Sequence, residues 1–440
     1  MKKILVCILA LCMVFAMVAC TTVDQPSGGG GAGAGGNNTG SNNNTGSNNN
    51  AGSNNNTGSN TPGGGDTPGG GEPAAPTEPF PGKIAVFSGP IDQNEEEYRA
   101  AEQIVRKYGA DKVVHVTYPA NFMAEPEQII TTMTTLGADP SIGLIVINQA
   151  VPGMLNAVDK LQETRPDIFV VFCNPQEDAP SISQRANLAM NPNTPARGFT
   201  SVQTAHKLGA KTFIHYSFPR HMSQPMNAAR MNNMQTECDR LGLEFVVLTA
   251  PDPTAEGGLT ATQQYMYEDI PKIIERYGKD TVIFSTNCGM QTPLITSVID
   301  QGGMYAEPCC ASPLHGFPIA LSLEVDLTTA DLNWVIDETT RILTEKGMGG
   351  RMANWPVPMA FLYTHVGVDY GIRYLNGEVP FDSINHTVLN ECITNYIMEA
   401  VGRNVNVMLE NYHEPFGATS NFDVELDNFI WILVESIIYQ

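Results

Sequence analysis

Polar side chains follow the apolar segments that this sequence predicts as strands, and their types suit hydrogen bonding to a small molecule. In open parallel sheets, ligands bind beyond the carboxyl ends of the strands, where helix N-termini also present free N–H groups. The first half of the chain places there Ser88, Asp92, Gln93, Tyr118, Asn148, Gln149 and Asn174. The second half places there Ser217, Arg220, His221, Asp252, Thr286 and Asn287. Because the set is mostly uncharged, it predicts a site for a small polar ligand.

A structural role competes with ligand contact at each of these positions. Asp92, Asn148 and Asn287 are residue types that cap the helix that follows a strand. The remaining polar residues equally suit surface turns. The sequence leaves both alternatives open.

Motifs for catalysis and for metal binding are missing from the sequence. The chain contains no GxSxG elbow, no GxxxxGK[ST] loop, no HExxH and no CxxC. Its eight histidines are scattered, although His215 and His221 flank one predicted strand end and His315 follows Cys309-Cys310 closely. A Cys–His nucleophile there is a weak alternative. We therefore expect no catalytic residue, no metal and no cofactor.

Six cysteines lie beyond the N-terminal segment, and the sequence does not decide their pairing. They are Cys173, Cys238, Cys288, Cys309, Cys310 and Cys392. An even number in an exported chain permits disulfides, whereas a domain of this size does not need them. Cys309 and Cys310 cannot easily bridge each other without strain.

Alternating strands and helices must position these side chains. Apolar strands are predicted at 84–87, 113–118, 142–147, 168–173, 212–217, 245–248 and 282–285, with amphipathic helices between most of them. The early strands recur about every 30 residues, which is the length of a βαβ unit. Such units imply parallel sheets covered on both faces. The pattern weakens between Pro175 and Pro195, which divides two successive α/β runs near residue 195.

The N-terminus predicts export and a lipid anchor. Lys2 and Lys3 precede an apolar run that ends at Met17-Val18-Ala19-Cys20. This resembles a lipobox, with Met17 where the pattern usually has Leu, so residues 1–19 are expected to be a signal peptide and Cys20 the acylated (palmitate-bearing) residue. An ordinary secretory signal cut near Ala19 is the alternative. Residues 20–82, rich in Gly, Asn, Ser and Pro, are expected to form a disordered tether.

The acidic charge of the chain argues against nucleic acid and anionic lipid surfaces as direct partners. Its formal net charge is −22 over 440 residues, and nucleic-acid binding relies on basic patches that neutralise phosphate. We expect no nucleic-acid partner. Attachment to the bilayer is expected through acylation of Cys20 and not through a basic face.

The strand that runs through Lys83-Ile84-Ala85-Val86-Phe87-Ser88-Gly89-Pro90, with its following loop, has the layout of a first strand and first ligand loop. With the lipobox, tether and two α/β runs, it resembles an uncharacterised (domain of unknown function) family of bacterial lipoproteins with the type I periplasmic-binding-protein-like fold. The resemblance implies two Rossmann-like lobes with parallel sheets and a ligand between them. The expected lobes are residues 83–195 and 196–349. Residues 350–440 are expected to return to the first lobe and in part complete it.

Three functions compete on these observations. The leading prediction is an extracytoplasmic, lipid-anchored solute-binding protein, at the cell surface or in the periplasm, that serves a membrane transporter or sensor. The alternative is a surface-anchored enzyme that uses the same cleft. A transcriptional regulator of the same fold would carry a DNA-binding helix-turn-helix at its N-terminus, where this chain has the predicted signal and tether.

Overall fold

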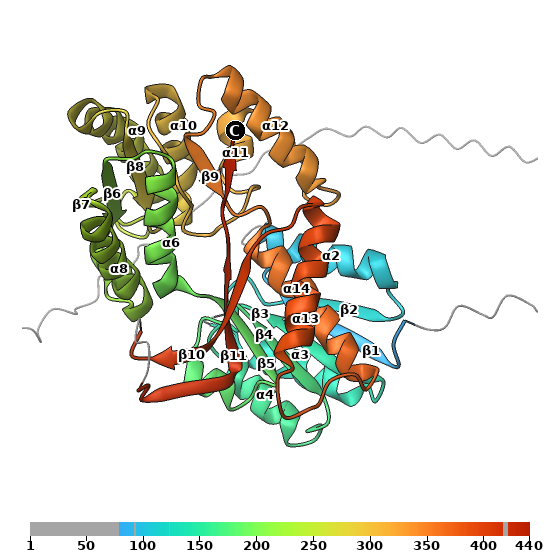
Figure 1. The fold of residues 1–440 in the computed structure, drawn as a ribbon. Helices are drawn as coiled ribbons and strands as arrows, with labels where there is room; N and C mark the ends of the chain where they lie inside the picture. The colour runs from blue at the N-terminus through green and yellow to red at the C-terminus, as the bar shows by residue number, and fades with distance from the viewer. Residues whose placement is uncertain (1–78, 92–93, 123, 417–420) are drawn as a thin grey trace, which may run out of the picture. The chain divides into compact units, whose positions relative to one another are not determined.

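The computed structural model describes residues 79–91, 94–122, 124–416 and 421–440 (Figure 1). The predicted signal, Cys20 and nearly all of the predicted tether lie outside the described residues, as do Asp92 and Gln93. Among the helices of the described ranges, none is both long and apolar enough to cross a membrane.

The first lobe is built on a seven-stranded sheet. Its strands are β1 (Lys83–Ser88), β2 (Val113–Thr117), β3 (Ile142–Asn148), β4 (Phe169–Cys173), β5 (Leu188–Pro192), β10 (Val407–Glu414) and β11 (Val424–Val434). They lie in the order β10-β11-β5-β4-β3-β1-β2. Each neighbouring pair is parallel except β10 and β11, which are antiparallel. Parallel pairing brings the carboxyl ends of β1 to β5 to one edge of the sheet.

Helices cover both faces of this sheet (Figure 1). They are α2 (Glu95–Tyr108), α3 (Pro126–Ala138), α4 (Met154–Gln162), α5 (Ala179–Ser183), α13 (Met359–Leu375) and α14 (His386–Val401). Alternate residues of β1 serve the two faces. Ile84 and Val86 belong to the core that contains α2, α13 and α14, while Ala85 and Phe87 belong to the core that contains α3, α4 and α5.

The second lobe has a smaller parallel sheet of β6 (Thr212–Ser217), β7 (Glu244–Thr249) and β8 (Thr281–Ser285) in the order β7-β6-β8. Its helices are α6 (Thr194–Lys207), α7 (Pro219–Met222), α8 (Pro225–Leu241), α9 (Gly258–Tyr277), the 3₁₀ helix η1 (Cys288–Met290), α10 (Gln291–Gln301), α11 (Phe317–Leu321) and α12 (Leu332–Glu345). Residues of α6 and α8 pack on one face of the sheet. Residues of α9 and α10 belong to the core on the other face.

The sequence predicts that residues 350–440 return to the first lobe, and in the structure this segment divides between the lobes. Helices α13 and α14 and strands β10 and β11 build the first lobe. Strand β9 (Met352–Asn354) instead pairs with β12 (Ile437–Tyr439). Met352 also bridges Tyr305, and Met304 bridges Val282 of β8. The chain therefore leaves the second lobe after β9 and comes back to it at β12.

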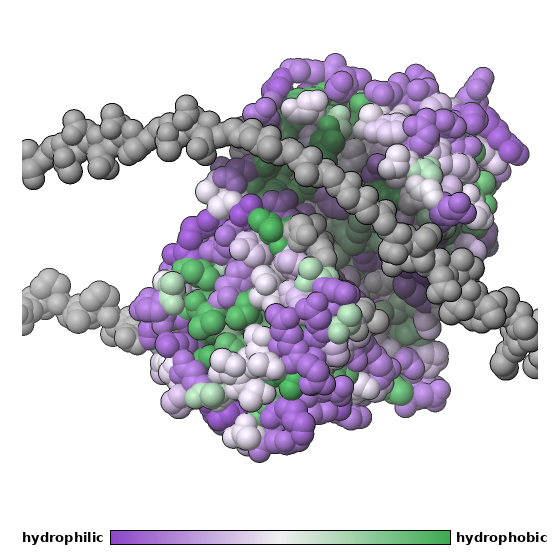
Figure 2. Space-filling model, turned by 180° about the vertical axis from the view of Figure 1, so that it is seen from behind, coloured by the Kyte–Doolittle hydropathy of each residue, from purple (hydrophilic) through white to green (hydrophobic). Residues whose placement is uncertain are grey.

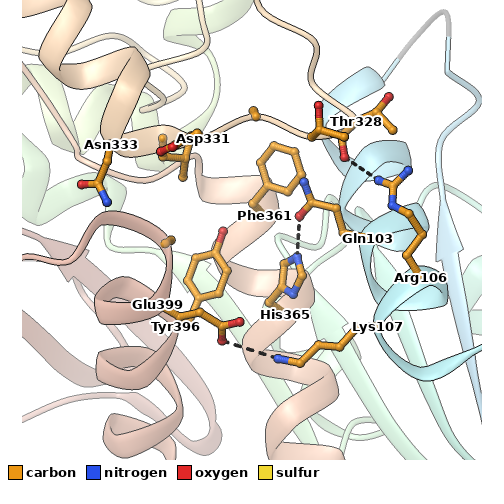
Figure 3. A pocket seen from close by; sticks show the side chains of 14 residues that line it. Gln103, Arg106, Lys107, Thr328, Asp331, Asn333, Phe361, His365, Tyr396 and Glu399 are labelled. Carbon is orange, nitrogen blue, oxygen red and sulfur yellow. Dashed lines mark hydrogen bonds and ion pairs between the residues drawn. The ribbon is translucent and has the colours of Figure 1, made fainter.

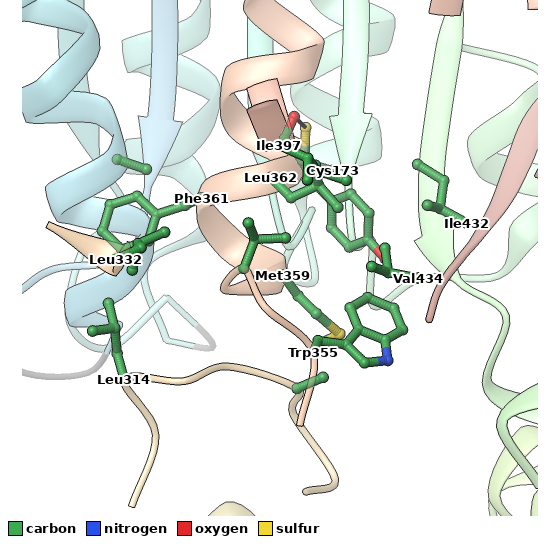
Figure 4. Packing of buried hydrophobic residues seen from close by; sticks show 14 of the residues in the cluster. Cys173, Leu314, Leu332, Trp355, Met359, Phe361, Leu362, Ile397, Ile432 and Val434 are labelled. Atoms are coloured by element: carbon green, nitrogen blue, oxygen red, sulfur yellow. Dashed lines mark hydrogen bonds between the residues drawn. The ribbon is translucent and has the colours of Figure 1, made fainter. Parts of the chain in front are cut away.

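The connections between the lobes share one buried apolar core. Trp355 and Met359 precede and begin α13, and they belong to the same buried core as Leu314 and as Val434 at the end of β11 (Figure 4). Because this core also contains residues of both sheets, apolar burial links the two lobes. The face in Figure 2 is largely hydrophilic, with hydrophobic residues in small patches.

Candidate functional site

A hydrogen-bonded cluster lies at the carboxyl edge of the first-lobe sheet. Gln149 follows β3 and donates from Nε2 to Oε1 of Glu97, in the first turn of α2, at 2.8 Å. Gln176 follows β4 and donates from its side-chain amide to the side-chain oxygen of Gln149. The backbone N–H of Gln176 also donates to the Gln149 carbonyl at 2.6 Å. The loops after two neighbouring strands therefore hold one carboxyl group.

The backbone at these two strand ends is strained. Gln149, Ala150 and Asn174 have φ values of 62°, 42° and 51°, in the left-handed region that residues with a Cβ atom rarely adopt. Such conformations cost about 1–3 kcal/mol each and concentrate at functional sites. The strain sets the direction in which the loops after β3 and β4 leave the sheet.

Glu97 is the most perturbed group in this cluster. Its side chain is buried, with 7% of the residue exposed. Burial raises the pKa of Glu97 to about 7, against the opposing effects of hydrogen bonds from the Gln149 side chain and the Gly89 backbone N–H. Near neutral pH the carboxyl group is thus divided between its charged and neutral forms, and it can accept or donate a hydrogen bond.

The second lobe has a cluster of hydroxyl and imidazole groups at the carboxyl ends of its strands. Ser217 ends β6, Thr286 follows β8, and their hydroxyl oxygens lie 2.7 Å apart. Nδ1 of His221, on α7, lies 3.3 Å from the same Thr286 oxygen. Burial lowers the pKa of His221, and the nearby Arg220 guanidinium lowers it further. His221 is therefore neutral at pH 7.

Arg230, on α8, adds a buried cation behind these groups. The residue is 2% exposed. Its Nη2 donates to Oδ1 of Asn227 at 3.1 Å, and its Nε has no hydrogen-bond partner. Asn227 in turn donates to the carbonyl of His221 at 3.3 Å. This chain of contacts connects the start of α8 with the end of the second-lobe sheet.

A cavity of about 600 Å³ is lined by the loop after β4 in the first lobe and by the start of α8 in the second. Of the two hydrogen-bonded clusters, only Gln176 and Asn227 line it. Asn174 and Gln176 line it from the first lobe, and Gln224 and Asn227 line it from the start of α8. Aromatic side chains of Tyr412, Phe416 and Phe429 contribute apolar wall. A mixed polar and apolar lining of this volume suits a small molecule.

The lobes also touch through a charged contact beside the first-lobe cluster. Ser312, from the segment that follows β8 and α10, donates its hydroxyl to Oε1 of Glu96 at 2.7 Å. Burial raises the pKa of Glu96, while the charge of His315 and the Ser312 hydrogen bond oppose that shift. Glu96 and Glu97 thus project from one helix turn toward two different partners.

Residues 82–353 match the family described as "Protein of unknown function (DUF3798)". The chain belongs to this family. Two uncharacterized proteins of Treponema pallidum (strain Nichols) are 34% and 30% identical to it over 172 and 176 residues. Each alignment covers 39% of this chain and 80% of the relative.

Solved structures share the fold of this DUF3798 protein to different degrees. A candidate transcriptional regulator from Clostridium difficile 630 superposes with a TM-score of 0.71 at 21% identity, covering 82% of this chain and 99% of that one. A periplasmic ribose ABC transporter protein from Conexibacter woesei DSM 14684 gives a TM-score of 0.44 at 14% identity, covering 74% and 98%. With two lobes of parallel strands in the orders β2-β1-β3-β4-β5 and β7-β6-β8, the predicted type I periplasmic-binding-protein-like fold is confirmed.

The structure gives some predicted contact residues internal roles instead. Asn148 is 1% exposed; it donates to the Phe87 carbonyl at 2.9 Å and accepts from the Thr364 hydroxyl at 2.8 Å. The Tyr118 hydroxyl donates to the Asn148 carbonyl, and the ring stacks on Phe87. Ser88 is buried, with its Oγ 2.8 Å from Nε2 of His115. In this protein these side chains join β1 to its neighbouring strands.

Other predicted residues lie at the surface of the second lobe. Arg220 forms a two-bond ion pair with Asp252 at 2.8 and 2.9 Å, and that guanidinium holds the pKa of Asp252 well below its ordinary value. Asn287 accepts from the Gly289 N–H at 2.9 Å and caps η1. These partners support a local structural role, and a ligand would have to compete with them.

Sequence reasoning missed Glu97, Gln176, Asn227 and Arg230. Gln176 lies two residues beyond the predicted Asn174 and was within reach of the same strand-end argument. Glu97 stands in the acidic first turn Glu95-Glu96-Glu97, which reads as stabilisation of a helix N-terminus. Arg230 lies mid-helix and reads as a surface cation. Nothing local marks either as buried.

A second cavity, of about 710 Å³, lies among α2, α13, α14 and residues 328–333 (Figure 3). Several of its polar groups are paired with one another. Lys107 faces Glu399 at 3.5 Å, and Nε2 of His365 lies 3.1 Å from the Gln103 side-chain oxygen. Burial lowers the pKa of His365 to about 3, so its ring is neutral. None of the predicted site residues lines this cavity.

Proposed function

We propose that this protein is an extracytoplasmic, lipid-anchored solute-binding protein that captures a small polar molecule between its lobes for a membrane transporter or sensor. The observation that carries the proposal is the cavity of about 600 Å³, which polar side chains of both lobes line. Gln176 lines this cavity and bonds to Gln149, whose amide donates to the buried Glu97.

The character of the ligand follows from the groups around the cavity. The side-chain amides of Asn174 and Asn227 line the cavity and can both donate and accept hydrogen bonds. The cavity of about 600 Å³ admits a molecule of metabolite size and excludes a folded protein segment. We therefore propose a small molecule with several hydrogen-bonding groups.

Binding between two lobes supports transfer to a second component. The Asn174 and Gln176 loops belong to one lobe and the start of α8 belongs to the other, so one ligand contacts both. A ligand that makes contacts in both lobes favours the arrangement in which they are close. A transporter or sensor could distinguish that arrangement from the empty one.

Native mass spectrometry of the full chain, purified under mild conditions, tests the proposal by detecting a retained small molecule. The retained molecule is then removed by partial unfolding, dialysis and refolding. Calorimetric titration of the ligand-free protein with the identified compound should show one binding site. Glu97→Gln should weaken binding by about tenfold or more, equivalent to about 1.4 kcal/mol, because Glu97 holds Gln149 and, through it, the cavity residue Gln176. Glu102→Gln is the matched control, because Glu102 lies on the same helix and pairs with Arg99 outside the cavity.

Three results would contradict the proposal. One is equal affinity of the Glu97→Gln variant, the Glu102→Gln variant and the unmodified chain. Another is the absence of any retained or titratable metabolite. The third is chemical conversion of the retained compound, which would support the surface-enzyme alternative.

A further inference from the structure

Three half-exposed cysteines gather at the carboxyl edge of the second-lobe sheet. Cys288 begins η1 directly after β8, and Cys309 and Cys310 lie in the segment that precedes α11. The Sγ atoms of Cys288 and Cys310 are 2.7 Å apart. The other cysteines of the described ranges, Cys173, Cys238 and Cys392, are buried.

The Cys309 thiol is hydrogen-bonded to the thiol of its neighbour Cys310 and also contacts other groups. Its Sγ lies 3.3 Å from the Thr286 carbonyl oxygen, to which it donates, and 3.8 Å from Nη2 of Arg230. A bond between the adjacent residues Cys309 and Cys310 would be strained. The geometry therefore favours Cys288 as the partner of Cys310.

The sulfur contact leaves little movement to make. An S–S bond measures about 2.05 Å, so the two sulfur atoms need to approach by less than 1 Å. Both side chains are half-exposed, which admits a small reagent. They also come from two separate segments, so the bond would join the loop after β8 to the loop before α11.

We propose that Cys288 and Cys310 form a reversible disulfide by exchange with a low-molecular-weight disulfide. The Cys288 thiolate attacks one sulfur of that molecule, forms a mixed disulfide and expels the first thiolate. The Cys310 thiolate then attacks Sγ of Cys288 and expels the second. The protein loses two protons and two electrons, and the small disulfide takes up both to become two thiols.

The bond would hold two loops of the second lobe together. Thr286 and Asn287 immediately precede Cys288, and Ser312, which contacts Glu96, closely follows Cys310. Oxidation would therefore fix the position of the Thr286 hydroxyl relative to the Ser312 segment, which contacts the first lobe. This inference concerns the thiol pair itself and does not depend on the identity of the ligand.

Differential alkylation of the full chain tests the proposal. The protein is equilibrated with reduced or oxidised glutathione near pH 8, trapped with N-ethylmaleimide and digested with chymotrypsin. Trypsin would leave both cysteines in one peptide, because no Lys or Arg lies between Asp280 and Thr340. We expect a linked Cys288–Cys310 peptide pair after oxidation, more than tenfold less alkylation of both residues, and unchanged alkylation of Cys309.

Single variants separate this pair from its neighbour. Cys309→Ser should retain the linked peptides, while Cys288→Ser should remove them even if Cys310→Ser fails to fold. Free, fully alkylated Cys288 and Cys310 in the oxidised protein would overturn the proposal. A peptide that links Cys288 to Cys309 in the unmodified chain would overturn it as well.

Discussion

Arg197 and Glu307 form a fully buried ion pair at the junction of the lobes, with Nε and Oε1 2.6 Å apart and side chains 1% and 2% exposed. Glu307 also accepts from Nε1 of Trp355 at 3.1 Å and from Oγ of Ser436 at 3.3 Å. Arg197 lies near the start of α6, Trp355 follows β9, and Ser436 lies between β11 and β12. One carboxylate therefore ties together the three segments by which the chain passes between the lobes.

Glu307→Gln should destabilise the protein by about 3–5 kcal/mol, because it leaves the Arg197 guanidinium buried without a counter-charge. Urea unfolding monitored by circular dichroism measures this loss. Glu338→Gln is the control, since it removes a carboxylate that pairs with Arg341 at the surface, where an ion pair contributes little. Equal unfolding midpoints of the two variants would show that the junction does not depend on the buried pair.

Glu97→Gln should stabilise the protein at alkaline pH and leave it unchanged at acidic pH. The pKa of Glu97 is raised from 4.5 to about 7, so the folded state holds a proton that the unfolded state releases between those values. Stability from this group is complete below pH 4.5 and is lost as pH rises through 7. The difference approaches about 3 kcal/mol at pH 8, and thermal melts of both proteins from pH 4 to pH 8 measure it.

Asn148→Ala should affect folding more than ligand binding. The change removes a donor to the Phe87 carbonyl and an acceptor for the Thr364 hydroxyl, both buried, at a cost of about 1–3 kcal/mol. Asn287→Ala removes only the cap of η1 and should cost about 1 kcal/mol or less. Melting and calorimetric binding are measured on the same samples. Normal stability with lost binding in Asn148→Ala would return this residue to the ligand site.

Cys20→Ser should release the protein from the membrane fraction. Acyl chains supply the proposed membrane affinity, and the acidic composition, with a net charge of −22, offers no basic face to replace them. Immunoblotting of membrane and soluble fractions from cells that express each form gives the distribution. An unchanged membrane fraction for the variant would exclude lipidation of Cys20 as the anchor.

Local patterns in the sequence determine the framework of both sheets. Short apolar runs such as Ile142–Asn148 become β3, and the regular spacing of strands and helices predicts parallel pairing. Helix α13 is different. It is apolar around most of its circumference and buries residues such as Phe361, Val366 and Tyr370. It lacks the contrast between faces that makes a helix recognisable, and its place is set by the layers packed on both sides.

Only the tertiary structure decided which polar residues matter at the site. Strand-end position predicted Gln149 and Asn174, because parallel strands bring their carboxyl ends to one edge. Strand-end position could not distinguish them from Asn148, whose side-chain amide is hydrogen-bonded to the neighbouring strand and to α13. Nor could it find Glu97, since an acidic first helical turn looks the same in sequence whether solvent or the loop after β3 lies against it. Burial and hydrogen-bond partners arise from segments far apart in the chain, and those relations exist only once the lobes are packed.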